Sequence, residues 1–437
     1  MNLETLPQYE CAYVLSDLHL GGEQGFQMFS EGEAFEQFCT RIAKDVKSTV
    51  PTLLIINGDF VDFLAEKGAT YWNGSEARTY LQEIAGRDEL KPVFDGLRKF
   101  VAKSGAKLVI TLGNHDLELT LPDVRETLLD LLTECKSNRR SRIELAFDGW
   151  GYRFKVGDRV ALATHGNEVD EYNFTRYDIL DQINREESLF GTSQVAKTWK
   201  PNAGTVFVID AINQIKKECP FIDMLKPEVP VAFLTLTILN PSNLVVADEV
   251  VRLKASAIAN EVKRPSSERR FLGSGELEDL TSFETGASFG GTAKTQLLED
   301  KINRYIYDRS RNIDDLIYGP EDELLGLREW LGEARSAITG MIDASVGLVE
   351  TAAGWVVDKA TKAGQRAHAE ALRTALKPFV NLDATKIDTL DEKDKELDQR
   401  FRKEYDVVFT GHTHSRRFAN RSHDRMGHFV NTGTWAG

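Results

Sequence analysis

Over its first 166 residues the chain alternates short apolar runs of strand length with helical patterns, and this order restricts the fold more than any other feature. The runs Leu53–Ile56 and Lys107–Leu112 are typical of buried strands. The segments Glu33–Lys47 and Lys91–Lys103 carry apolar residues at helical spacing. Strand, helix, strand and helix in succession are typical of parallel β-α units, in which helices pack on a sheet. The pattern predicts an α/β fold.

The pattern changes at about residue 173, where long helical segments begin, and strand patterns return after about residue 404. Residues 265–292 are rich in glycine and serine and predict a loop. We therefore expect a core that is interrupted by a large, mainly helical insertion. The predicted parts are the first core segment (1–172), the insertion (173–404) and the second core segment (405–437). Helices are predicted in the insertion at 243–263, 295–308, 321–334, 337–375 and 391–403.

Aspartate, asparagine and histidine residues follow the predicted core strands at the points where they end. In an open α/β sheet, ligands bind beyond the carboxyl ends of the strands, so residues far apart in sequence can converge there. Each cluster alone is also compatible with turn or helix-cap chemistry, but five such clusters together favour a metal pair. Carboxylate and imidazole ligands suit ions such as Mn, Fe, Zn or Ni. The clusters are Asp17 and His19; Asp59 and Asp62; Asn114, His115 and Asp116; His165; and His412 and His414.

In this order the clusters resemble the five motifs of the calcineurin-like metallophosphoesterases. The resemblance implies a four-layer α/β/β/α sandwich that holds a dinuclear metal centre. It also implies hydrolysis of a phosphodiester or pyrophosphate through attack by a metal-bridged hydroxide. Residues 16–21 and 430–434 further resemble the bacterial phosphodiesterase and pyrophosphatase branches. The motifs are Asp-x-His (17–19), Gly-Asp-x-x-Asp (58–62), Gly-Asn-His-Asp (113–116), His-Gly (165–166) and Gly-His-x-His (411–414).

The same resemblance implies a role for each matched residue. His115 would protonate or stabilise the leaving oxygen, and Asp62 would orient His115. The implied cofactor is a pair of divalent ions, with Mn²⁺ expected first and Fe, Zn, Ni or Mg as alternatives. The implied ligands are Asp17, His19 and His414 for the first ion, Asp59 as the bridge, and Asn114, His165 and His412 for the second ion.

Three positions after the motifs refine this expectation. Protein phosphatases of the superfamily carry Arg-Gly after the second aspartate, but Asp62 is followed by Phe-Leu, which argues against protein phosphatase activity. Asn167 stands where many relatives carry aspartate, so the polar contact made there is open. Arg416 and Arg417 directly follow the last motif and are candidates to bind a second phosphate or the leaving group.

The chain is acidic, with 54 Lys and Arg against 68 Asp and Glu and a formal net charge of −14. An acidic chain repels the phosphate backbone, so strong nucleic-acid binding is not expected. The expected substrate is a small or lipid-linked phosphoester, selected by the insertion, which is also a candidate surface for a partner protein. The alternatives are a metal-dependent nuclease, a phosphomonoesterase and a non-catalytic scaffold on the same fold.

The four cysteines lie far apart without a Cys-x-x-Cys pair, as a reducing cytosol permits. The first residues lack the basic and apolar regions of a secretory signal. No stretch supplies the ~20 uninterrupted apolar residues that a membrane span needs. We therefore expect a cytoplasmic protein without a transmembrane segment.

Overall fold

The computed structural model describes residues 6–22, 27–47, 51–170, 172–213, 387–421 and 427–435. The chain divides into two compact units, and the described residues up to Ile209 and from Ile387 onward belong to the first unit. The predicted helices at 243–263, 295–308, 321–334 and 337–375 and the predicted loop at 265–292 lie outside the described residues. The boundaries predicted at residues 172 and 404 stay predictions.

The first sheet is fully parallel and forms from the amino-terminal part of the chain. Its strand order is β2-β3-β4-β5. These parallel strands and the helices between them confirm the α/β prediction for this part of the chain. The strands are β2 (Cys11–Leu15), β3 (Thr52–Asn57), β4 (Ala106–Thr111) and β5 (Ile143–Ala146).

The second sheet is mixed and has the order β1-β6-β7-β8-β10-β9. Its central pair, β7 and β8, is parallel and aligns Ala163 with Phe409. Since β7 precedes the predicted insertion and β8 follows it, the two core segments join in one sheet. The strands are β1 (Gln8–Tyr9), β6 (Tyr152–Val156), β7 (Arg159–Ala163), β8 (Val407–Thr410), β9 (Arg417–Arg421) and β10 (Gly427–Asn431).

A hydrophobic cluster lies between the two sheets, and the strand periodicity explains it. Successive side chains of a strand point to opposite faces. In β3, Leu53 and Ile55 therefore join a cluster that also contains Phe154 and Ala161 of the second sheet. Leu54 and Ile56 lie on the opposite face of the strand and join the larger cluster under the helices. Both faces of β3 are buried, which is why its sequence is apolar throughout.

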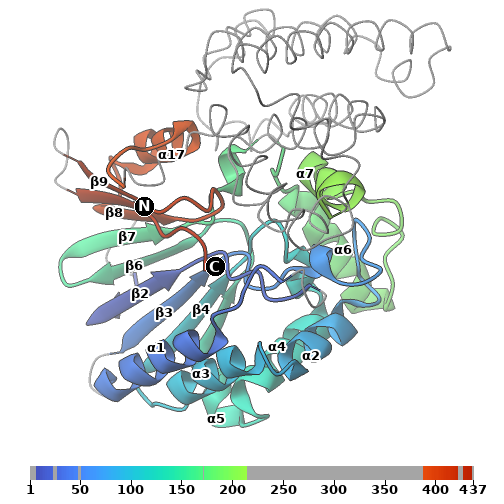
Figure 1. Cartoon of the computed structure of the whole chain (residues 1–437), viewed down its shortest axis with the longest axis horizontal. Helices are drawn as coiled ribbons and strands as arrows, with labels where there is room; N and C mark the ends of the chain where they lie inside the picture. The colour runs from blue at the N-terminus through green and yellow to red at the C-terminus, as the bar shows by residue number, and fades with distance from the viewer. Residues whose placement is uncertain are drawn as a thin grey trace, which may run out of the picture. The chain divides into compact units, whose positions relative to one another are not determined.

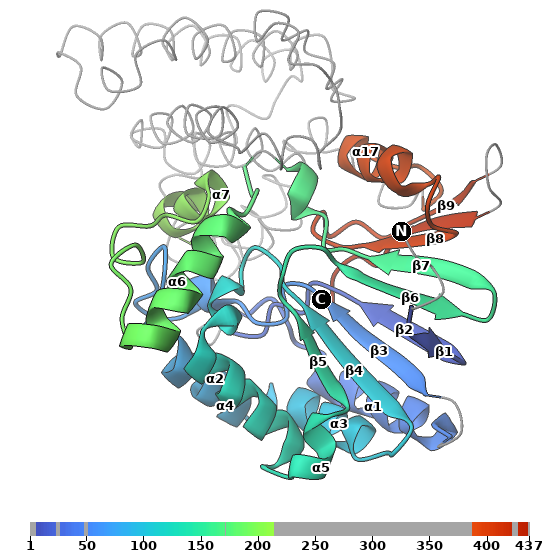
Figure 2. The same cartoon turned by 180° about the vertical axis from the view of Figure 1, so that it is seen from behind.

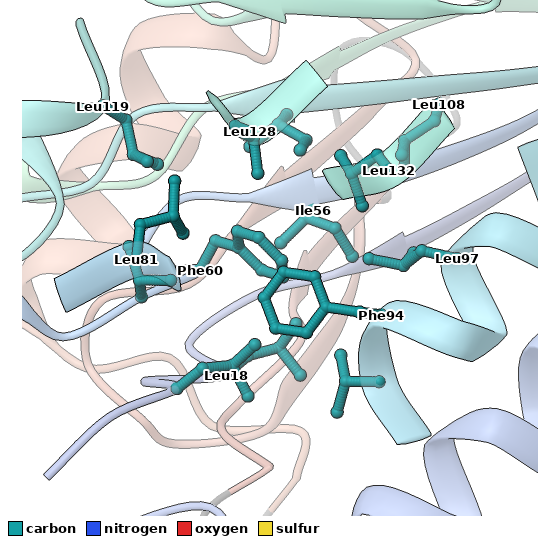
Figure 3. Packing of buried hydrophobic residues seen from close by; sticks show 14 of the residues in the cluster. Leu18, Ile56, Phe60, Leu81, Phe94, Leu97, Leu108, Leu119, Leu128 and Leu132 are labelled. Carbon is teal, nitrogen blue, oxygen red and sulfur yellow. The ribbon is translucent and has the colours of Figure 1, made fainter. Parts of the chain in front are cut away.

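Helices cover the outer face of the first sheet (Figure 1). In α3 the apolar residues Val93, Phe94, Leu97 and Phe100 are all buried because they recur at helical spacing on one face. Figure 3 shows Phe94 and Leu97 packed with side chains from the sheet, the strand-end loops and the neighbouring helices. The covering helices are α1 (Gly32–Asp45), α2 (Ala77–Gly86), α3 (Lys91–Val101) and α4 (Pro122–Thr133).

Helix α17 (Glu392–Phe401) covers the outer face of the second sheet (Figure 2). Its Leu397 is buried in a cluster with Leu162, Val408 and Phe429 of that sheet. The helix predicted at 391–403 is thereby confirmed, with Asp391 as its N-cap.

Within the described parts of the chain, every helix is too short or too polar to span a membrane. The remaining elements are η2 (Phe63–Ala65), η3 (Leu117–Thr120), α5 (Ser137–Arg140), η4 (Asn167–Val169), α6 (Tyr177–Phe190), α7 (Ala203–Phe207) and the π-helix η5 (Val208–Ile212).

Candidate metal centre

The polar clusters of the sequence lie directly beyond the ends of β2, β3, β4, β7 and β8. Backbone hydrogen bonds join these ends to one another. The amide of Asp17 donates to the carbonyl of Gly58 at 3.2 Å, and the amide of Gly411 donates to that of His165 at 2.8 Å. The His412 amide donates to both carboxylate oxygens of Asp17 at 3.0 Å, which connects the two sheets. The five clusters therefore meet at one place.

The backbone is left-handed at most of the predicted ligands. Among the described residues, seven non-glycine residues have φ in this region, and five of them are predicted ligands. The conformation costs ~1–2 kcal/mol for a residue that carries a Cβ, and it persists only where the surrounding structure enforces it. Such strain is concentrated at functional sites. The five ligands are Asp17 (φ 52°), His19 (46°), Asp59 (49°), His412 (66°) and His414 (56°).

The first group of candidate ligands is Asp17, His19 and His414. The Nε2 atoms of His19 and His414 lie 3.0 Å apart. His414 Nε2 also lies 3.4 Å from Asp17 Oδ1. Two imidazole nitrogens and a carboxylate oxygen that face one another at these distances can hold one metal ion.

Asp59 lies between this group and His165. Its Oδ2 is 3.2 Å from His165 Nε2 and 3.5 Å from His19 Nε2, and its Oδ1 accepts the amide of His115 at 2.9 Å. A Cβ on Gly113 would lie only 2.1 Å from Asp59 Oδ1, so glycine is required there. Asp59 thus contacts histidines on both sides of the centre, as a bridging carboxylate must.

The other predicted ligands surround His165. Its Nδ1 donates to the carbonyl of Asn57 at 2.9 Å, which directs Nε2 into the centre. The ring of His412 packs edge-on against His165, with ring centroids 5.4 Å apart. Asn114 is buried, and its Nδ2 donates to Asn173 Oδ1 at 3.3 Å. All seven ligands expected from the sequence are therefore gathered in one region.

Asp62 connects the centre to His115. Its Oδ1 lies 3.1 Å from His115 Nδ1, and its Oδ2 lies 3.3 Å from His19 Nδ1. In each of these two histidines, Nδ1 faces Asp62, so Nε2 lies on the side of the ring away from Asp62. The Asp62 carboxylate is almost fully buried, whereas the side chain of His115 is 14% exposed.

Buried carboxylates and histidines lie side by side in the centre and shift one another's pKa values. Burial alone would raise the pKa of Asp17, but the hydrogen bond from His414 and the charge of His165 lower it to about 2. Burial would likewise lower the pKa of His165, but the charge of Asp59 raises it to about 10. Two buried carboxylates therefore stay ionised, and such a pair attracts cations because isolated buried charge is costly.

A family model described as calcineurin-like phosphoesterase matches residues 12–217. Residues 12–217 therefore form a domain of the metallophosphoesterase superfamily. The phosphoesterase match contains the first four motifs, and the fifth, with His412 and His414, lies beyond its end. The domain is that of a metal-dependent phosphoric ester hydrolase. Searches of curated proteins and of solved structures found no significant match.

The donor set of this phosphoesterase fits divalent metal ions. Within the described part of the chain, Asn114 Oδ1 and His165 Nε2 are buried atoms without a hydrogen-bond partner. Buried polar atoms normally have one, so both are available as ligand atoms. The mixture of carboxylate, amide and imidazole donors suits Mn, Fe, Zn or Ni better than a soft thiolate-binding ion.

The two candidate arginines, Arg416 and Arg417, differ in their exposure to solvent. Arg416 is exposed, whereas Arg417 lies in β9 and is only 9% exposed. The charge of Arg417 acts on buried Asp394, whose pKa burial raises well above its usual value. Arg416 is thus the one with a side chain available to solvent. Asn167 is buried and donates to the carbonyl of Asn173 at 3.1 Å, so it has a structural contact.

Sequence reasoning assigned no role to three polar residues beside the centre. Asp116 accepts the amides of Gly113 and Phe60, both at 2.8 Å, and so braces the second and third motifs. Asp170 and Asn173 contact predicted ligands from the segment that follows His165. The position of Asp116 inside a motif was a usable signal, but isolated polar residues such as Asp170 and Asn173 carry none.

Glu118 should make the stability of the fold depend on pH. Burial raises its pKa from 4.5 to about 7, although the Asn73 amide donates to it at 2.8 Å. Between these values the folded chain binds more protons than the unfolded chain, so stability falls as pH rises through this window. At higher pH the loss amounts to about 3 kcal/mol. Glu118→Gln keeps the acceptor oxygen and should remove this loss.

Urea unfolding of the wild type and of the E118Q variant at pH 5 and pH 8 measures the effect. The advantage of the variant should grow with pH. Glu186→Gln is the matched control because Glu186 is only partly buried and its pKa is lowered rather than raised. An equal difference between variant and wild type at both pH values would contradict the assignment to Glu118.

Proposed function

We propose that the chain is a dinuclear metal-dependent phosphoesterase that hydrolyses a phosphodiester or a pyrophosphate, within the bacterial phosphodiesterase and pyrophosphatase-like branch. The observation that supports this most is the meeting of five strand-end clusters around Asp59, beside the Asp62–His115 pair. A scaffold without catalytic activity would need neither the strained ligand turns nor a histidine oriented by a buried carboxylate.

In this proposal each residue of the centre has a distinct task. Asp59 would be shared between the ions, which we propose to be Mn²⁺, with Fe, Zn, Ni or Mg as alternatives. When bound, two such ions would lower the pKa of a water molecule and withdraw charge from the phosphoryl oxygens. The first ion would be held by Asp17, His19 and His414, and the second by Asn114, His165 and His412.

The residues of the chain itself would handle the proton of the leaving group. Asp62 accepts from His115 Nδ1, so Nε2 of His115 is the atom that would donate a proton to the leaving oxygen. Asp62 also contacts His19 Nδ1, so it would hold the proposed ligand His19 and the proposed acid His115 in fixed positions relative to each other. We propose Arg416, which is exposed, to meet the far part of the substrate, with Arg417 as the less accessible candidate.

The acidity of the chain does not conflict with an anionic substrate. The net charge of −14 is spread over the whole chain, whereas two dications would outweigh Asp17 and Asp59 at the centre itself. Recognition would then be local, which favours a small or lipid-linked phosphoester over a long nucleic acid.

We propose that the whole fold is a four-layer α/β/β/α sandwich. Its insertion at 173–404 would select the substrate or bind a partner protein. The free thiols of Cys11, Cys39 and Cys135 support a reducing, cytoplasmic location.

Turnover of bis-p-nitrophenyl phosphate and p-nitrophenyl phosphate, each with Mn²⁺, Mg²⁺, Zn²⁺ or Ni²⁺, tests the proposal. We expect metal-dependent turnover with preference for the diester and the highest rate with Mn²⁺. An Asp59→Asn preparation, purified in parallel, controls for contaminating phosphatases. Preference for the monoester would replace the diesterase assignment with a phosphomonoesterase, and equal rates with and without a chelator would overturn the metal requirement.

A further inference from the structure

A short segment after the fourth motif contacts two of the proposed ligands, although it belongs to none of the five motifs. The segment includes Asp170 and Asn173 and lies between η4 and α6. Asp170 is mostly buried and Asn173 is buried. Polar side chains in such positions need hydrogen-bond partners, and here the partners lead directly to His412 and Asn114.

Asp170 fixes the ring of His412. Its Oδ2 lies 2.8 Å from His412 Nε2, so the ionised carboxylate accepts the Nε2 proton and leaves Nδ1 as the ligand atom. The carboxylate is itself held, because Oδ1 accepts the amide of Tyr172 at 3.0 Å. This is the arrangement in which an outer carboxylate orients a metal-binding histidine and raises its basicity.

Asn173 links this carboxylate to Asn114. Its Nδ2 donates to Asp170 Oδ2 at 3.1 Å, so its Oδ1 faces the other way and accepts Nδ2 of Asn114 at 3.3 Å. The direction of these bonds decides which end of the Asn114 amide faces the centre. Since Nδ2 of Asn114 is engaged, its Oδ1 is left as the atom without a partner. An amide can ligate a metal ion only through that oxygen.

Two elements at opposite ends of the predicted insertion hold the segment in place. On α7, the amide of Gly204 donates to the carbonyl of Tyr172 at 2.7 Å, and a Cβ on Gly204 would lie 1.9 Å from Asn173 Oδ1. On α17, Lys393 Nζ donates to the carbonyl of Val169 at 3.0 Å and lies 3.9 Å from Asp170 Oδ1. The segment is therefore enclosed on both sides.

We propose that Asp170 and Asn173 are positioning residues that orient His412 and Asn114 as ligands of the second metal ion. The inference rests on the proposed dinuclear centre. The hydrogen-bonded chain runs from His412 through Asp170 and Asn173 to Asn114, so one network sets the ligand atoms of two residues that are almost 300 positions apart in sequence. Ligands of the first ion are not part of it.

Calorimetric titration of Mn²⁺ into chelator-treated protein tests the proposal without any activity assay. The wild type should bind two ions. Asp170→Asn replaces the carboxylate that faces two donors, His412 Nε2 and Asn173 Nδ2, by an amide. The affinity for the second ion should fall by about 10–100-fold, while the affinity for the first ion should stay unchanged. Asn173→Ala removes the link to Asn114 and should weaken the same ion.

Asp178→Asn is the matched control, because Asp178 is exposed on α6 and pairs with Arg176. Thermal unfolding of each chelator-treated variant separates a local effect from a loss of fold. Two ions bound by D170N and N173A with wild-type affinities would overturn the positioning role alone. A wild type that binds a single ion would overturn the dinuclear centre and this inference with it. Weakening of both ions in a folded variant would also contradict a role confined to the second ion.

Discussion

Replacing Asp59 by asparagine is expected to remove most of the bound metal and most of the phosphoesterase activity. The side chain is buried, and its Oδ2 lies within 3.5 Å of both His165 Nε2 and His19 Nε2. Loss of a charge shared by two ions should lower metal affinity by more than the 10–100-fold that outer residues typically cost. Asparagine keeps the shape of the side chain, can still accept the His115 amide and tolerates a left-handed backbone.

Elemental analysis of protein dialysed against metal-free buffer gives the metal content, and turnover of bis-p-nitrophenyl phosphate gives the activity. Asp178→Asn provides the same chemical change at an exposed site on α6. Its metal content and turnover should equal those of the wild type. Full metal occupancy in the D59N protein would contradict the bridging role of Asp59.

His115→Ala is expected to leave the metal content unchanged while turnover falls by about 10²–10⁴-fold on substrates with poor leaving groups. The side chain of His115 contacts Asp62 and packs edge-on against the ring of His19, but it is not one of the proposed ligands and is partly exposed. A leaving group such as p-nitrophenolate departs without a proton, so the loss on that substrate should be much smaller. A dependence of the defect on leaving-group pKa therefore distinguishes an acid from a binding residue.

Rates for aryl and alkyl phosphodiesters that span a range of leaving-group pKa values measure this dependence. Asp62→Asn should reproduce part of the defect, since it alters the partner that orients His115. His428→Ala is the control histidine, because His428 is exposed on β10 and bonds to Asn420. A uniform loss on every ester would exclude His115 as the proton donor.

Much of the core could be predicted because its strands are buried on both faces. The run Leu53–Ile56 is apolar throughout and is followed at once by a polar cluster, which marks both β3 and the residues at its end. Parallel strands place their carboxyl ends together, so the convergence of Asp17, Asp59 and Asn114 followed from topology alone.

Other features have no local signature in the sequence. Helix α2 (Ala77–Gly86) is short and mixed in composition, and its buried face becomes apparent only against α4 (Pro122–Thr133). The burial of Arg417 depends on the pairing of β9 with β10, which are joined only in the folded sheet. Asp170 is one acidic residue among many until the fold brings His412 beside it.

The left-handed turns that carry five of the proposed ligands also limit which substitutions can be interpreted. A β-branched residue at Asp17 or His19 would be resisted by the backbone before any ligand chemistry was lost, because such residues are disfavoured at positive φ. Asparagine and glycine accept this conformation. A complete substitution scan of these positions should therefore separate into two classes, variants that keep the fold but lose metal and variants whose fold is damaged as well. Inactivity alone would not distinguish them, but the yield of folded protein would.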